Sequence, residues 1–91
     1  MRAFARRTIG PGVCEMKRLY VRPQFRGRGL ARMLAEEVIG DARRAGYRSM
    51  VLDTIGSMDA ARTLYRDLGF RPVAAYYDNP LPDVIYLGLD L

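Results

Sequence analysis

A glycine turn flanked by arginines is the part of this sequence whose residue types and spacing indicate chemistry most directly. Residues 24–31 read Gln-Phe-Arg-Gly-Arg-Gly-Leu-Ala and lie between an apolar, strand-like segment and an amphipathic, helix-like segment. Glycines let backbone N–H groups approach an anion, and the start of a helix adds unpaired amides and the positive end of its dipole. Arg26, Arg28 and Arg32 surround the turn with positive charge. The segment therefore predicts a pyrophosphate cradle and a nucleotide-type cofactor.

Two better-known phosphate motifs do not fit this turn. A dinucleotide fingerprint of the form Gly-x-Gly-x-x-Gly requires glycine where the chain has Arg32, and the Gly-Lys-Ser/Thr of a P-loop does not follow. The plain alternative is that Gly27 and Gly29 only form a tight turn before a helix. The surrounding arginines favour anion binding over that alternative.

The length and composition describe one small domain, residues 1–91. A chain of 91 residues with 49% hydrophobic and 27% charged residues is typical of a globular domain and too short for two. Its apolar runs are all shorter than the roughly 18 residues of a membrane span, and the basic start lacks the apolar core of a signal peptide. We therefore expect a cytoplasmic protein without membrane contact.

The cysteine and histidine counts exclude several kinds of chemistry. Cys14 is the only cysteine, which excludes an internal disulfide, and the sequence contains no histidine. Zinc clusters and the Ser-His-Asp and Cys-His nucleophiles are therefore not expected. Any catalysis must use a carboxylate, a phenol or backbone groups, and we expect no metal.

Positive charge gathers in the first third of the chain. Residues 1–34 carry nine of the 15 Lys and Arg residues against one acid, Glu15. This asymmetry predicts an anionic ligand for that part of the chain, and by itself it would also suit nucleic acid. The arginines cluster at a glycine turn, however, and no helix-turn-helix or aromatic RNA-binding signature is visible. A basic nucleic-acid-binding domain is therefore the weaker alternative.

Hydrophobic periodicity predicts an α/β domain with a mixed sheet. Alternating segments on either side of a Gly-Pro-Gly turn at residues 10–12 predict a hairpin, and the strand-helix-strand succession after it predicts parallel strands. The expected elements are strands at residues 3–9 and 13–21, a helix at 29–45 ended by Gly46, a strand at 48–55, a helix capped by Ser57 and ended by Gly69, and strands at 73–77 and 84–91. The order is β-β-α-β-α-β-β.

Two motifs in this order resemble the GNAT superfamily of acyl-CoA-dependent N-acetyltransferases. The first is Gln24-x-x-Gly27-x-Gly29 after the strand, and the second is residues 61–70, which read Ala-x-x-Leu-Tyr-x-x-Leu-Gly-Phe. The resemblance covers about residues 13–91. It implies a GNAT-like fold, acetyl-CoA as co-substrate, and an amine of a small molecule or a protein as acetyl acceptor.

The resemblance also implies which residues hold acetyl-CoA. Gln24 would open the pyrophosphate loop, backbone amides from Arg26 to Ala31 would bind the phosphates, and the backbone of Leu19 to Val21 would pair with the pantetheine arm like an added strand. The full implied set is Leu19, Tyr20, Val21, Gln24, Arg26, Gly27, Arg28, Gly29, Leu30 and Ala31.

Tyr65 matches the tyrosine with which GNAT proteins protonate the leaving CoA thiolate. A phenol with an ordinary pKa near 10 keeps its proton at neutral pH and can donate it to a thiolate whose thiol has a pKa of about 8.5. From spacing alone, a core aromatic on a helix stripe with Leu64 and Leu68 explains Tyr65 better. The motif makes Tyr65 a catalytic candidate.

Glu15 is the candidate general base. It shares a strand face with Leu19 and Val21, from which it could deprotonate the acceptor amine directly or through water. Strand carboxylates are more often solvated or paired, here with Lys17 or Arg18, and that alternative stays open.

The sequence begins later in the fold than GNAT proteins do. A strand, two helices and a second strand normally precede the hairpin and supply much of the acceptor site, and they are missing from residues 1–91. A catalytically impaired acyl-CoA-binding module or fragment is therefore the alternative to an active enzyme. The uncovered edge of the first strand predicts marginal stability or self-association into a homo-oligomer.

Overall fold

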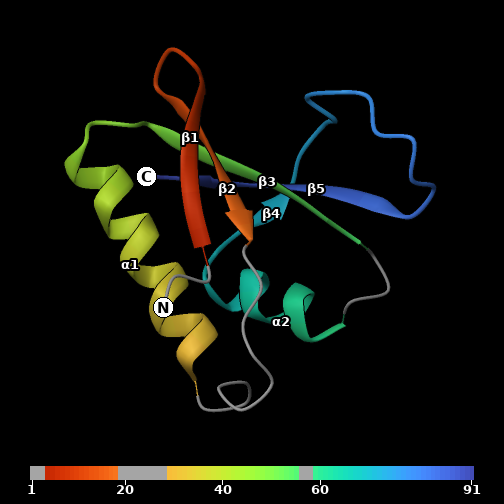
Figure 1. Cartoon of the computed structure of the whole chain (residues 1–91), viewed down its shortest axis with the longest axis horizontal. Helices are drawn as coiled ribbons and strands as arrows, with labels where there is room; N and C mark the ends of the chain where they lie inside the picture. Colours follow the sequence, from red (N-terminus) through yellow and green to blue (C-terminus); the bar gives the residue numbers. More distant parts are fainter. Residues whose placement is uncertain (1–3, 19–28, 56–58) are drawn as a thin grey trace.

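The computed structural model describes residues 4–18, 29–55 and 59–91 of the chain. In chain order, the elements are β1 (Phe4–Gly10), β2 (Val13–Arg18), α1 (Leu30–Arg44), β3 (Ser49–Ile55), α2 (Asp59–Asp67), β4 (Arg71–Pro72) and β5 (Val84–Asp90). The predicted order of strands and helices is confirmed (Figure 1). Among the helices so described, none is long and apolar enough to cross a membrane.

The described strands form one mixed sheet in the order β1-β2-β3-β5-β4. β1 and β2 make the predicted antiparallel hairpin, through a turn in which Gly12 has a φ of 72°. β2 and β3 run parallel, with α1 in the crossover between them, as the strand-helix-strand pattern predicts. β5 then pairs antiparallel with all seven residues of β3. The sheet therefore joins the hairpin to the C-terminal strands through β3.

The parallel strands β2 and β3 separate part of the way along. Their last registered pair is Glu15↔Val51, although β2 continues to Arg18 and β3 to Ile55. Figure 1 shows the two strands diverging toward these ends. The two strands therefore no longer pair beyond Glu15, and we call this divergence the opening between β2 and β3.

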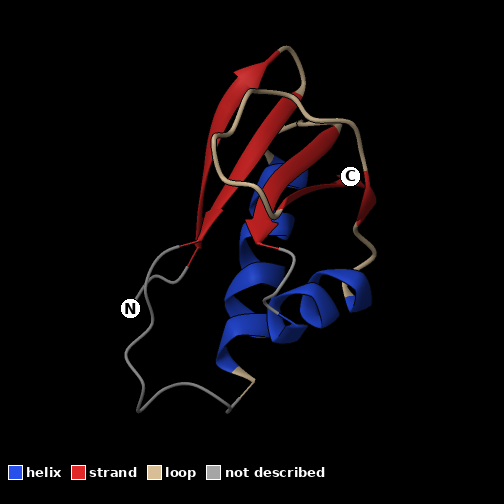
Figure 2. Ribbon diagram, turned by 90° about the vertical axis from the view of Figure 1, so that its right-hand side faces the viewer, coloured by secondary structure: helices blue, strands red, loops and turns tan. Residues whose placement is uncertain are grey.

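Both helices pack on one face of the sheet (Figure 2). Side chains alternate along β3, so Met50 and Leu52 enter this core while Val51 and Asp53 lie on the opposite face. The core consists of Cys14, Met16, Ala35, Ile39, Ala42, Met50, Leu52, Ala61, Tyr65, Phe70 and Leu87. One face of the sheet is thus covered by helices, and the other carries polar side chains.

Each helix ends at a glycine in the left-handed region. Gly46 has a φ of 91° after α1, and Gly69 has a φ of 100° after α2. Behind α2, the N–H of Phe70 donates to the carbonyl of Tyr65 at 3.0 Å, the long bond of a Schellman motif. The helix ends predicted at Gly46 and Gly69 are confirmed, and the second one brings Phe70 next to Tyr65.

The strand predicted at residues 73–77 is wrong. β4 is only two residues long, and the chain after it forms a loop to β5 that has no regular structure. Two tyrosines of this loop bond to carboxylates on the polar sheet face: Tyr76 to Glu15 and Tyr77 to Asp53. These bonds stabilise a loop folded across the sheet in place of a strand along its edge.

Candidate active site

The N-terminus of α1 has no side-chain cap. Gly29 is the N-cap residue with a φ of 70°, and it has no side chain that could bond the free amides of the first turn. The first turn of this helix also contains no acid, the residue type that usually balances the helix dipole there. Ala31 is exposed in that turn, and Arg32 pairs with Glu36 at 3.1 Å one turn later. Within the described part of the chain, no capping side chain and no first-turn acid competes with an anion for these amides.

Three of the predicted cofactor residues stand at this helix start. They are Gly29, Leu30 and Ala31. The others lie outside the described residues: Leu19, Tyr20, Val21, Gln24, Arg26, Gly27 and Arg28. The helix cap predicted at Ser57 lies outside them as well. The structure thus supplies the helix end of the predicted cradle.

Glu15 is a buried carboxylate bound by three donors. Its side chain is 0% exposed, between the hairpin and the β4–β5 loop. Arg7 Nε lies 2.8 Å and Lys17 Nζ 3.3 Å from Oε1 of Glu15, and the Tyr76 hydroxyl donates to Oε2 at 2.5 Å. The pairing with Lys17 that the sequence offered is confirmed. Sequence reasoning missed Arg7 and Tyr76 as partners of this acid.

The surroundings set the protonation states of this cluster. Burial raises the pKa of Glu15. Hydrogen bonds from Tyr76, Arg7 and Lys17 lower it by more than burial raises it, so the pKa of Glu15 lies below its ordinary value of 4.5. Burial and the bond to Glu15 raise the pKa of the Tyr76 hydroxyl well above its ordinary value. At neutral pH Glu15 is therefore an anion whose two oxygens both accept hydrogen bonds.

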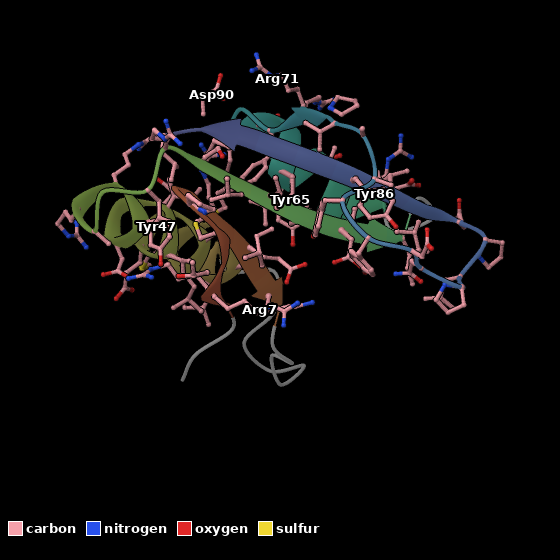
Figure 3. All side chains as sticks on the ribbon, turned by 90° about the horizontal axis from the view of Figure 1, so that it is seen from above. Arg7, Tyr47, Tyr65, Arg71, Tyr86 and Asp90 are labelled. Atoms are coloured by element: carbon pink, nitrogen blue, oxygen red, sulfur yellow. The ribbon has the colours of Figure 1, made fainter. Side chains whose placement is uncertain are left out.

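Three tyrosines gather on the same sheet face. The rings of Tyr76, Tyr77 and Tyr86 lie 5.2, 5.4 and 5.6 Å apart in pairs. Tyr77 donates to Asp53 at 2.5 Å, Asn79 Nδ2 donates to the Tyr77 hydroxyl at 2.7 Å, and Tyr86 donates to the Tyr77 carbonyl at 3.0 Å. Figure 3 shows Tyr86 on β5 where the β4–β5 loop folds back. Ring contacts and hydrogen bonds together hold this loop against the sheet, and we call the three rings the tyrosine wall.

Tyr65 lies on the other face, in the core beneath the helices. The residue is 3% exposed, and its ring meets that of Phe70 edge-on at a centroid distance of 5.7 Å. The packing expected of a core aromatic is confirmed. The catalytic role of Tyr65 stays a prediction.

Acidification should weaken the fold through Glu15. A group whose folded pKa is below its unfolded value of about 4.5 stabilises the fold above that pH, and the contribution is lost as the pH falls through the folded pKa. At about pH 7, we expect Glu15→Gln to lower the free energy of unfolding by about 1–3 kcal/mol, because the amide loses charge-assisted hydrogen bonds. Urea unfolding at about pH 7 and about pH 3.5 checks this. A difference between wild type and variant that stays the same at both values would contradict the assignment.

The comparisons with known proteins agree on one family. Residues 2–70 match the model of the acetyltransferase (GNAT) family. An uncharacterised N-acetyltransferase of Schizosaccharomyces pombe is 49% identical over 82 residues, which are 90% of this chain and 50% of that protein. One of Dictyostelium discoideum is 42% identical over 80 residues, 87% of this chain and 37% of that protein.

A solved structure shares the fold. The crystal structure of a Bacillus subtilis acetyltransferase in complex with CoA superposes with a TM-score of 0.84 at 22% identity, over 97% of this chain and 67% of that one. The present chain spans about half the length, or less, of these two relatives.

Proposed function

Because the chain belongs to the GNAT family of acetyltransferases, we propose that it binds acetyl-CoA and transfers the acetyl group to an amine. The proposal depends on the helix that connects two parallel strands. This helix, α1, begins without a side-chain cap, and the strands that it connects, β2 and β3, separate beyond Glu15. The free amides suit the CoA pyrophosphate. The separated strands suit an extended pantetheine arm, which can pair with β2 as an added strand would.

The proposal also assigns cofactor contacts to residues that lie outside the described ranges. Leu19 to Val21 follow β2 in the sequence and would pair with the arm, and the amides of Arg26 to Ala31 would hold the phosphates. A cytoplasmic location stays a prediction from the sequence. The basic nucleic-acid-binding alternative has no support from the family match.

In the reaction, the amine nitrogen bonds to the acetyl carbonyl carbon and the carbon–sulfur bond breaks. The thiolate that leaves gains a proton from an acid, and the amine loses one to a base. We assign the acid to Tyr65, on the strength of its place in the family motif and its position in α2, from which its side chain enters the core. Tyr65 and Glu15 lie on opposite faces of the sheet, so an acyl group between β2 and β3 would have one on each side.

The general-base role of Glu15 stays a prediction. A carboxylate that accepts a proton needs an accessible oxygen, and both oxygens of Glu15 already accept bonds from Arg7, Lys17 and Tyr76. Release of the Tyr76 bond would free Oε2. Without that release, Glu15 acts by holding its three partners in place.

Titration with acetyl-CoA and an assay of CoA thiol release test the proposed function. We expect acetyl-CoA to bind with heat exchange in calorimetry, and thiol release to rise when an amine acceptor is added. Binding without thiol release for any amine would favour the impaired binding module. Retention on DNA that weakens with salt, with no effect of acetyl-CoA, would favour the nucleic-acid-binding alternative.

A further inference from the structure

Arg7 and Lys17 place two positive charges around one buried acid on the polar sheet face. Arg7 is the partner of Glu15 across the β1–β2 pair, and Lys17 lies two residues further along β2. The side chains of Arg7 and Lys17 are 64% and 44% exposed, while that of Glu15 is 0% exposed. Figure 3 labels Arg7, which lies in the middle of β1 opposite Glu15. A ligand on this face therefore meets the two cations and not the acid.

Most N–H donors of Arg7 and Lys17 are not used in their contact with Glu15. Both cations approach the same oxygen, Oε1, and Arg7 does so through Nε alone. Across the ranges that the structure describes, the two Nη groups of Arg7 have no partner. Two cations that share one carboxylate keep a net positive charge. A guanidinium with free Nη groups binds a carboxylate in a two-pronged manner, and an adjacent ammonium strengthens that binding.

The cation pair lies beside the point where β2 and β3 separate. Glu15↔Val51 is the last registered pair, so Lys17 stands on the part of β2 that borders the opening. Residues two apart on a strand lie about 6.5–7 Å from each other. A carboxylate held by Arg7 and Lys17 would thus keep an amine, a few bonds away, close to an acyl group in the opening.

The neighbouring strand provides the opposite charge. Asp53 lies on the same face of β3, where it accepts hydrogen bonds from Tyr77 and Asn79. The charge on this face therefore changes from positive on the hairpin to negative on β3, and the tyrosine wall lies next to Asp53. This order of charges matches a small molecule that carries both a carboxylate and an amine.

We propose that Arg7 and Lys17 form a carboxylate subsite, and that the acetyl acceptor is a free amino acid. The proposal rests on the proposed acetyl transfer and names its acceptor class. The carboxylate of the amino acid bonds to the Nη groups of Arg7 and to Nζ of Lys17, and its amine is directed toward the opening between β2 and β3. The buried carboxylate of Glu15 holds both cations in position.

Binding of amino acids compared with their amides tests the subsite. The probes are L-alanine, L-aspartate, L-methionine and L-phenylalanine, each paired with the compound in which every carboxylate is an amide. NMR titrations with and without CoA measure their affinities, so the result does not depend on turnover. We expect at least one acid to bind ten-fold or more tightly than its amide. Arg7→Gln and Lys17→Gln should each reduce that preference to about three-fold or less.

Controls separate this subsite from general charge and from the proposed function. Arg43→Gln removes an exposed arginine of α1 and should leave the preference for acids unchanged. Equal binding of acids and amides, or no binding of any acid at about 50 mM, would overturn the subsite. Acetyl-CoA titration without acceptor tests the cofactor site alone, because neither Arg7 nor Lys17 is among the residues proposed to bind acetyl-CoA. Normal acetyl-CoA binding with no preference for acids would therefore refute the acceptor class and leave the proposed function standing.

Discussion

An Ala31→Glu variant is expected to bind acetyl-CoA about 100-fold more weakly than wild type while unfolding at a slightly higher temperature. Ala31 is exposed in the first turn of α1, where neither a cap nor an acid is present. A carboxylate about 6 Å from a phosphate charge costs roughly 3 kcal/mol at an effective dielectric constant of 20, or about 100-fold in affinity. The same charge interacts favourably with the helix dipole, by about 0.3–1 kcal/mol.

The opposite signs of the two effects separate loss of the site from loss of the fold. Ala31→Gln is the matched control, because it has the same size as the glutamate without its charge. Calorimetric titration with acetyl-CoA gives the affinity, and thermal unfolding without ligand gives the stability. We expect the glutamine variant to retain most of the affinity. An Ala31→Glu variant with wild-type affinity would place the phosphates away from this helix start.

Replacement of Tyr65 by phenylalanine should lower the rate of acetyl transfer by about 100-fold and leave the affinity for acetyl-CoA nearly unchanged. The substitution keeps the ring, and with it the edge-on contact with Phe70, but removes the proton donor. A positioned general acid typically contributes about 10²–10⁴-fold to a rate. CoA thiol release at saturating substrates measures the rate, and calorimetry measures the affinity.

A second tyrosine provides the control for Tyr65→Phe. Tyr47 follows α1, and its hydroxyl bonds to that of Thr8 on β1, away from the opening between β2 and β3. Tyr47→Phe also removes one hydroxyl and should change the rate by less than about three-fold. If Tyr65→Phe and Tyr47→Phe retain equal activity, Tyr65 is a core residue only.

The prediction of the fold succeeded where local signals are strong. Alternation and helical periodicity depend on neighbours within a few residues, so the hairpin, both helices and strands β3 and β5 were predictable. The stops at Gly46 and Gly69 were predictable for the same reason, because a left-handed residue at a helix end favours glycine. The strand predicted at residues 73–77 failed because its apolar and aromatic residues fit a strand and a folded loop equally well.

The sequence by itself determined the family, through two motifs that each lie within ten residues, and it singled out Glu15 and Tyr65. Only the tertiary structure decided the surroundings of Glu15. Its partner Tyr76 lies 61 residues away in the chain, and Arg7 reaches it across the hairpin. Whether a strand carboxylate is solvated or buried depends on which distant segment folds over it. No local pattern records that contact, because it arises from the packing of a loop on a sheet face.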